Sequence, residues 1–315
     1  MTIREYIPLK DFSHFKIGGP ARFFIDYGSF DELSFAISFS KEVSLPFFIL
    51  GGGTNILFPD EGLKAVVIRD ISTTLSHKKI NDDIFVRVSA GVSFATLLDY
   101  CATHSLSGLE WAGGLPGSVG GGVRGNAGAF HGECKDTVYE VVSVSSLDPK
   151  EKIIRDNFAC SFSYRDSIYK KKPDEIITEV IFRLRPGNQE EMKKAIQEKI
   201  DYRITRQPLE YPNIGSIFKN IPWEKVPSTH QQNPFFLQKK KNDPFPVLPT
   251  AVLFDHAGFK GRAEGDAMIS TKHPSFIINA GAATSREVRE LIAAVKSDSL
   301  QRFDISLEEE VIVVN

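Results

Sequence analysis

The chain has 315 residues, 42% hydrophobic content and a formal net charge of -2 at pH 7. This composition allows two or three packed units, and the balanced charge gives no basic footprint for nucleic acid or anionic lipid. No apolar run has membrane-spanning length, and the first residues lack the layout of a secretory signal. We expect a cytoplasmic monomer with small-molecule partners, no nucleic acid and no membrane.

Neither a disulfide framework nor a metal site is predicted. The cysteines are odd in number and lack a Cys-x-x-Cys spacing, and no two histidines have a His-x-x-x-His spacing. The cysteines are Cys101, Cys134 and Cys160.

Short apolar strands alternate with helices in the first half of the chain. The apolar spacing predicts helices near residues 30–40 and 94–104. Strands are predicted at residues 21–25, 47–50, 65–68, 84–90, 138–145 and 176–183. The pattern is typical of an α+β fold.

An apolar run at residues 45–50 ends in a glycine turn. The turn reads Gly51, Gly52, Gly53, Thr54 and Asn55. Glycine amides followed by Thr and Asn side chains can gather into an anion-binding concavity. Alone, the pattern is weak evidence, because a glycine turn between two strands is more often only a connection.

A second segment, from Gly113 to Glu133, contains nine glycines. It also carries apolar residues, which distinguishes it from a flexible linker, and glycine lets backbone amides approach a ligand closely. A pyrophosphate would suit such a segment. A formal Gly-x-Gly-x-x-Gly begins at Gly120, but no strand precedes it and no helix follows it, so a Rossmann fold is rejected.

The composition changes after residue 186, where an amphipathic helix around residues 192–200 indicates a domain boundary. Thr284 and Glu287 form a capping-box sequence for the last helix, and a final strand is predicted at 307–314. Residues 222–249 hold six prolines and no periodic pattern. This segment is interpreted as an active-site lid or, with some preference, a disordered insertion.

Six motifs in order are similar to one known family. They are Leu50-Gly-Gly-Gly-Thr-Asn-Ile-Leu57, Gly113-Gly-Leu-Pro-Gly-Ser-Val-Gly-Gly121, Asn126-Ala-Gly-Ala129, Tyr164-Arg-Asp-Ser167, Gly215-Ser-Ile-Phe-Lys-Asn220 and Leu307-Glu-Glu-Glu-Val311. Together they resemble the UDP-N-acetylenolpyruvoylglucosamine reductase family nearly end to end. The chain lacks an obvious tyrosine-bearing loop insertion and so resembles the family's shorter subgroup, although 222–249 is longer than expected.

The resemblance implies an α+β fold in which a two-lobed FAD-binding domain of the vanillyl-alcohol-oxidase type (1–70 and 71–186) precedes a C-terminal α+β substrate-binding domain (187–315). It implies FAD and NADPH as cofactors. The implied reaction reduces UDP-N-acetylglucosamine-enolpyruvate to UDP-N-acetylmuramate in peptidoglycan synthesis. The FAD contacts that it implies are Gly51, Gly52, Gly53, Thr54, Asn55, Gly113, Gly114, Pro116, Gly117, Ser118, Gly120, Gly121, Asn126, Ala127, Gly128 and Ala129.

The resemblance also implies three catalytic residues. Arg165 would hold the substrate carboxylate, Ser216 would donate a proton, and Glu310 would polarise the enolpyruvyl group or relay a proton. The implied substrate contacts are Tyr164, Lys219 and Asn220, of which Lys219 or Asn220 would make the serine hydroxyl more acidic.

Each catalytic residue also has a plainer interpretation. Arg165 could form a surface pair with Asp166, Ser216 could be a turn serine, and the three glutamates could mark an exposed edge strand. On a strand Glu308 and Glu310 share a face, so the pattern alone does not choose between them.

Two other functions stay open on the sequence. One is a flavoprotein of the same architecture acting on a different carboxylate-bearing substrate. The other is a non-catalytic FAD- or nucleotide-binding module. Convergence of Arg165, Ser216 and Glu310 on one face of the flavin would favour an enzyme.

Overall fold

The computed structural model describes residues 2–314, which divide into two compact units. The first unit comprises residues 2–7, 21–52 and 64–202, and the second comprises residues 8–20, 53–63 and 203–314. Helix α5 (Gln189–Arg206) begins in the first unit and ends in the second. The units are discontinuous in sequence, and they differ from the three consecutive segments expected from the sequence.

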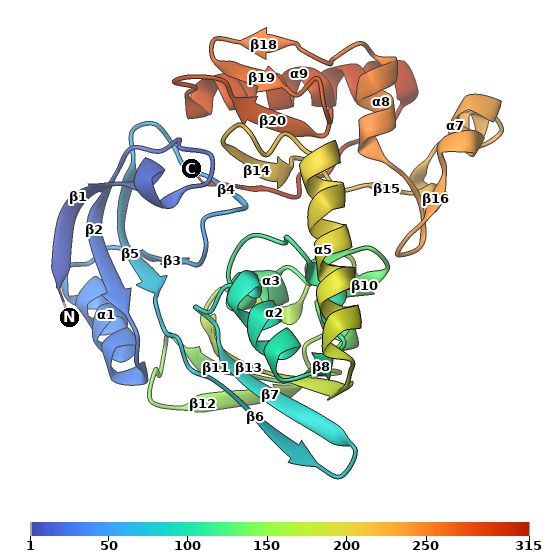
Figure 1. Ribbon diagram of the computed structural model, residues 1–315. Helices are drawn as coiled ribbons and strands as arrows, with labels where there is room; N and C mark the ends of the chain where they lie inside the picture. Colours follow the sequence, from blue (N-terminus) through green and yellow to red (C-terminus); the bar gives the residue numbers. More distant parts are fainter. Residues whose placement is uncertain (1, 315) are drawn as a thin grey trace. The chain divides into compact units, whose positions relative to one another are not determined.

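The first unit contains a four-stranded sheet with the order β1-β2-β5-β3, in which β3 is parallel to β5. Its strands are Ile3–Pro8 (β1), Pro20–Tyr27 (β2), Phe47–Leu50 (β3) and Leu63–Asp70 (β5). Helix α1 (Phe30–Glu42) begins after its N-cap, Ser29, and buries Leu33 and Ile37 in the core that it shares with this sheet (Figure 1).

A six-stranded sheet in the same unit has the order β12-β11-β13-β7-β6, and β8 also pairs with β13. Its strands are Leu75–Ile80 (β6), Asp83–Ser89 (β7), Leu106–Ser107 (β8), Val138–Ser145 (β11), Lys152–Asp156 (β12) and Glu175–Pro186 (β13). Leu97 and Val123, from helices α2 (Phe94–Thr103) and α3 (Val119–Arg124), share a core with Phe182 of β13.

Short elements lie between α2 and β13. A two-stranded hairpin pairs β9 with β10 in antiparallel register. The short elements are Glu110–Ala112 (η2), Gly128–Ala129 (β9), Gly132–Glu133 (β10), Cys134–Asp136 (η3) and Ile168–Lys171 (α4).

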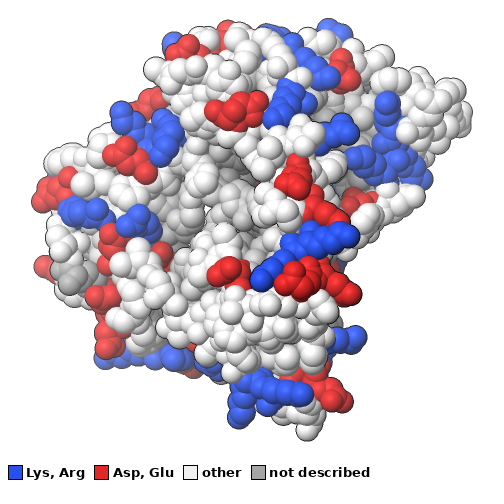
Figure 2. Space-filling model, viewed as in Figure 1, with Lys and Arg blue, Asp and Glu red and all other residues white. Residues whose placement is uncertain are grey.

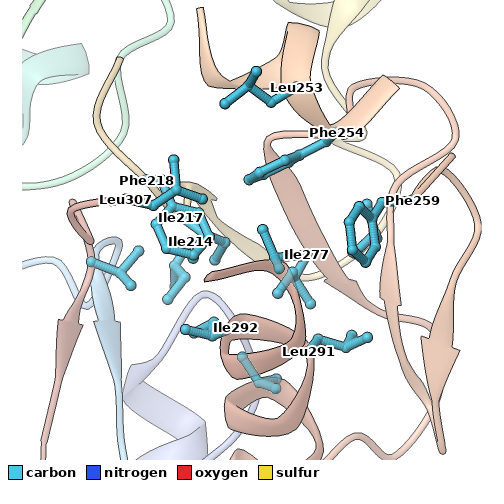
Figure 3. Packing of buried hydrophobic residues seen from close by; sticks show 14 of the residues in the cluster. Ile214, Ile217, Phe218, Leu253, Phe254, Phe259, Ile277, Leu291, Ile292 and Leu307 are labelled. Atoms are coloured by element: carbon cyan, nitrogen blue, oxygen red, sulfur yellow. The ribbon is translucent and has the colours of Figure 1, made fainter. Parts of the chain in front are cut away.

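The second unit is built on a four-stranded sheet with the order β14-β20-β19-β18. Its strands are Asn213–Ser216 (β14), Ala263–Glu264 (β18), Ala267–Ile269 (β19) and Phe276–Asn279 (β20). Helix α9 (Ser285–Phe303) begins with a capping box between Thr284 and Glu287. Its Leu291 and Ile292 lie in one core with Ile277 of β20 (Figure 3).

Four further elements belong to this unit. Strands β4 and β21 pair in parallel. The four are Leu9–Phe12 (η1), Ile56–Leu57 (β4), Thr250–His256 (α8) and Ile312–Val313 (β21).

The expectation that residues 222–249 are disordered or structureless is wrong. The region forms a small sheet with the order β15-β17-β16, together with short helices. Its elements are Ile221–Pro222 (β15), Trp223–Lys225 (η4), Ser228–Gln231 (α6), Pro234–Lys239 (α7), Lys241–Asn242 (β16) and Pro246–Leu248 (β17). Val226, Phe236 and Leu248 are buried in the core of the second unit. Elements this short show no period in a sequence, although their apolar side chains anchor them.

The other predicted elements are mostly confirmed. Both early helices and the six strands of the first half occur within three residues of their expected bounds, and a helix begins after Thr284 as expected. The final strand is only partly correct, because residues 307–314 form a single bridge at Glu309 and the short β21.

Charged side chains are mixed in sign. Helix α5 carries both acidic and basic residues, and the face shown in Figure 2 has side chains of both signs. Within residues 2–314, no helix is both long and apolar enough to cross a membrane. The same residues contain no group of three or more His, Cys, Asp or Glu side chains arranged to hold a metal ion.

Candidate functional site

The two glycine segments predicted to bind a pyrophosphate meet in the first unit. A Cβ atom added to Gly52 would lie 2.7 Å from the Cα of Gly117 and 3.1 Å from the backbone nitrogen of Ser118. One added to Gly51 would lie 2.5 Å from the Oγ of Ser118. The contact therefore requires glycine in the first segment, since no side chain fits there.

The backbone of the second segment is held by its neighbours. The amide of Phe94 donates to the carbonyl of Gly117 (3.1 Å), and the amide of Val119 donates to the carbonyl of Val92 (2.8 Å). Gly117 has a φ of 103°, in the region that favours glycine. The hydroxyl of Ser118 accepts from Gly121 as the N-cap of α3. The segment is thus rigidly placed beside Gly51 and Gly52.

Backbone donors collect at this contact. In the described part of the chain, the N–H groups of Gly51, Gly52, Gly117 and Ser118 have no hydrogen-bond partner. Gly52 is exposed, and Gly51 and Gly117 are half-buried. Amide donors on a surface without intervening side chains fit an anionic diphosphate. The remaining residues of the first turn, Gly53 to Asn55, belong to the second unit.

The middle of the second glycine segment is helical rather than an open loop. Its glycines allow α3 to pack closely: a Cβ added to Gly120 would lie 2.7 Å from the Cβ of Ala90, and one added to Gly122 would lie 2.3 Å from the ring of Phe94. Close helix packing thus explains part of the glycine content. The Rossmann interpretation remains excluded, because η2 precedes the segment and the β9–β10 hairpin follows it.

Arg165 lies against the hairpin that ends the glycine segment. It has a positive φ of 55°, a strained conformation for a non-glycine residue that often marks functional positions. Its guanidinium donates to the carbonyl of Gly128 (2.7 Å) and lies 3.9 Å from the carboxylate of Glu133. Asp166 pairs with Lys171 (3.1 Å).

Asn126 contributes to this region from inside the protein. It is fully buried, and its amide donates to the carbonyl of Ser163 (2.9 Å) and to the carboxylate of Glu133 (3.4 Å). Its Oδ1 accepts from the backbone of Lys135 (3.0 Å). The side chain expected near the flavin therefore supports the hairpin and the Arg165 loop. Tyr164 lies beneath the Arg165 guanidinium, which is 5.0 Å from its ring centre.

The motifs containing Ser216 and Glu310 pair with each other in the second unit. The amide of Lys219 donates to the carbonyl of Glu308 (2.9 Å), and the amide of Glu310 donates to the carbonyl of Ile217 (2.8 Å). The side-chain amide of Asn55 donates to the carbonyl of Glu310 (3.0 Å). Three motifs that are far apart in the sequence thus come together within one unit.

Ser216 ends β14 and follows Gly215, which has a φ of 83°. The next residues, Ile217 and Phe218, are buried in the core, so the half-buried Ser216 is placed by packing (Figure 3). The ammonium of Lys219 pairs with Glu308.

The three glutamates have different surroundings. Glu308 pairs with Lys219, and Glu309 pairs with Lys296 (2.8 Å), whereas Glu310 is half-buried beside the serine segment. The three glutamates precede β21, and Glu309 makes a single β-bridge with Phe218. Asn220 accepts from the backbone of Thr250 (3.3 Å), which ties the end of the serine segment to α8.

The cysteines are unsuited to nucleophilic chemistry. Burial raises the pKa of Cys134, which follows the hairpin, to about 12, and that of Cys101 also to about 12. Burial raises the pKa of Cys160 to about 11. At neutral pH these thiols are protonated, and the thiolate is the reactive form.

Sequence reasoning missed Glu133, the last residue of the glycine segment. Its carboxylate is only 5% exposed and pairs with Lys135 (2.5 Å) as well as Arg165. The available signal was a lone carboxylate at the end of an otherwise apolar, glycine-rich stretch.

Family models match both parts of the chain. Residues 21–157 match the FAD binding domain, and residues 207–314 match the C-terminal domain of UDP-N-acetylenolpyruvoylglucosamine reductase. The chain therefore combines an FAD-binding domain with a C-terminal α+β domain, and the protein is an FAD-dependent oxidoreductase.

Relatives extend over the whole chain. It is 36% identical to the UDP-N-acetylenolpyruvoylglucosamine reductase of Syntrophomonas wolfei over 98% of this chain and 93% of that protein. It is 34% identical to the UDP-N-acetylenolpyruvoylglucosamine reductase of Chlamydia muridarum over 99% of this chain and 95% of that protein. The crystal structure of the Thermus caldophilus enzyme matches with a TM-score of 0.77 at 30% identity, covering 100% of both chains. The chain belongs to the UDP-N-acetylenolpyruvoylglucosamine reductase family.

Proposed function

We propose that this protein reduces the enolpyruvyl ether of UDP-N-acetylglucosamine-enolpyruvate to UDP-N-acetylmuramate, with NADPH as reductant, in peptidoglycan synthesis. Similarity along the whole chain to relatives that carry this enzyme name is the observation that supports it. NADPH and UDP-sugars are cytoplasmic metabolites, so a cytoplasmic location belongs to the same proposal, as does a monomeric state.

The glycine segments would hold FAD. Gly51, Gly52, Gly117 and Ser118 supply backbone donors for the pyrophosphate, supported by their mutual contact and by the lack of other partners for their amides within residues 2–314. Residues 126–129 would lie near the flavin. FAD, when bound and reduced by NADPH, supplies a hydride to the terminal vinyl carbon of the substrate.

Arg165 would bind the substrate carboxylate. Addition of hydride to the vinyl carbon leaves negative charge on the adjacent carbon, which is delocalised into that carboxylate. A guanidinium stays charged and can form two parallel hydrogen bonds to a carboxylate, so it stabilises this charge as it develops. The ordered, 19% exposed side chain supports this role, because a preorganised donor needs little rearrangement.

Ser216 would then donate its Oγ proton to the adjacent carbon and complete the reduction. A hydroxyl is a weak acid, so this step requires a strongly basic, enolate-like acceptor. Glu310 would polarise the enolpyruvyl group or return a proton to the serine. The backbone hydrogen bond between Glu310 and Ile217, the residue after Ser216, supports cooperation between these two residues.

Visible absorption of the purified protein tests the proposal. NADPH is added anaerobically, followed by the enolpyruvyl nucleotide. The flavin band should bleach with NADPH and recover with the nucleotide. A flavin that is reduced by NADPH but never reoxidised by the nucleotide would indicate a different substrate. Protein that cannot be reconstituted with FAD would refute the cofactor assignment.

A further inference from the structure

We propose that Glu133 is a positioning residue, whose buried carboxylate holds the guanidinium of Arg165 in place for the substrate. The proposal rests on the proposed function, because it gives Arg165 a substrate carboxylate to bind. Glu133 itself lies behind Arg165 in the first unit and needs no contact with the substrate.

The carboxylate of Glu133 lies among polar and cationic groups. Its side chain is 5% exposed, and a buried polar group is stable only where it has hydrogen-bond or ion-pair partners. Oε2 has two partners, Lys135 (2.5 Å) and the amide of Asn126 (3.4 Å). Oε1 has no hydrogen-bond partner in the described chain, and the Nη1 of Arg165 lies 3.9 Å from it.

The hairpin register explains why Glu133 and Arg165 meet. Glu133 is directly opposite Gly128 in the β9–β10 pair, and the carbonyl of Gly128 accepts the other end of the guanidinium. A Cβ added to Gly128 would lie 2.6 Å from the Cγ of Glu133, so the carboxylate side chain covers the glycine. One cross-strand pair therefore supplies two contacts of the arginine side chain.

Two cations lie beside the Glu133 carboxylate, of which Lys135 is closer than Arg165. Without the negative charge between them, Lys135 and Arg165 would repel each other, and the guanidinium would lose the contact with Glu133.

E133Q tests the proposal, since it keeps the shape and removes the charge. The matched control is E175Q, because Glu175 is also a buried carboxylate (7% exposed) that pairs with an arginine and a lysine, Arg155 and Lys172. In the FAD-loaded protein, E133Q should slow flavin reoxidation by the enolpyruvyl nucleotide about tenfold or more and leave reduction by NADPH unchanged. E175Q should change neither half-reaction.

A double-mutant cycle separates positioning from general damage. If Glu133 acts through Arg165, adding E133Q to R165K should slow flavin reoxidation by less than about twofold relative to R165K alone. The guanidinium that Glu133 would position is already absent in R165K. Additive effects of the two substitutions would overturn the proposal. Equal impairment of both half-reactions by E133Q would also overturn it.

Crystal structures of the FAD-loaded wild type and E133Q give a readout independent of activity. The guanidinium of Arg165 should leave the carbonyl of Gly128 in E133Q, while the β9–β10 register is retained. An unchanged Arg165 would overturn the proposal. If the nucleotide failed to reoxidise wild-type flavin, the proposed function would fail, and this structural comparison would still decide the role of Glu133.

Discussion

Gly52→Ala is the most direct test of the contact between the glycine segments. Gly52 lies outside the left-handed region of φ, so an alanine costs nothing in backbone conformation there. Its Cβ would, however, lie 2.7 Å from the Cα of Gly117, whereas ordinary contacts begin at 3.4 Å. The neighbouring atoms are backbone, which cannot rotate away. The two segments must therefore separate by about 0.7 Å.

The expected magnitude follows from this overlap. Overpacking a tight contact costs about 1–3 kcal/mol. The free protein can relieve that strain by moving the segments apart, whereas the FAD complex is proposed to need them together. If the whole cost falls on binding, FAD affinity should fall about 5- to 150-fold, at about 1.4 kcal/mol for each tenfold change.

Titration of apoprotein with FAD, followed by flavin fluorescence, measures this affinity. Gly125→Ala is a suitable control, because its Cβ would lie 3.6 Å from the carbonyl of Gly121, an ordinary contact in the same segment. It should bind FAD within about twofold of wild type. Unchanged FAD affinity in Gly52→Ala would refute the argument that the cofactor requires this close approach.

Three further predictions concern other parts of the protein. Ser216→Ala should leave flavin reduction by NADPH nearly intact and slow reoxidation by the nucleotide, because only the second half-reaction needs its proton; stopped-flow traces with both steps equally impaired would contradict this role. Thr284→Ala should lower the free energy of unfolding by about 1 kcal/mol through loss of the α9 cap, as measured by urea denaturation. The third prediction concerns pH: burial raises the folded-state pKa of the thiols above their usual value of 9.0, so the folded state binds these protons more tightly. The contribution of the thiols to the free energy of unfolding should therefore be complete below pH 9 and fall by up to about 1.4 kcal/mol per pH unit per thiol toward pH 11–12. The thiols are those of Cys101, Cys134 and Cys160. Equal unfolding free energies at about pH 8 and about pH 10.5 would count against their burial.

Local patterns in the sequence were sufficient for most of the regular elements. The capping box at Thr284 and the apolar spacing of α1 and α2 depend on neighbouring residues, so they are visible before folding. The elements of residues 222–249 were not predicted from local patterns, because each of them is too short to show a periodic apolar spacing. What stabilises them is burial of single side chains such as Phe236, which depends on the rest of the unit.

The glycines show a second limit of sequence reasoning. A glycine that faces a ligand and one that faces a neighbouring side chain are the same letter in a sequence. Gly120 and Gly122 make room for Ala90 and Phe94, whereas Gly52 makes room for another backbone segment that carries unpaired donors. Only the second kind of contact leaves amides open to an anion, and it depends on two segments that are more than 60 residues apart.

Asn55 illustrates why residue roles also depend on tertiary pairing. The sequence places it after a glycine turn, where a ligand contact is the natural interpretation. In the structure its amide donates to the carbonyl of Glu310, whose own amide donates to Ile217, next to Ser216. A residue of the predicted cofactor turn therefore restrains the backbone of a predicted catalytic residue. Changes at Asn55 should consequently affect the placement of Glu310 as well as any ligand contact, so loss of FAD affinity alone would be an incomplete measure of its role.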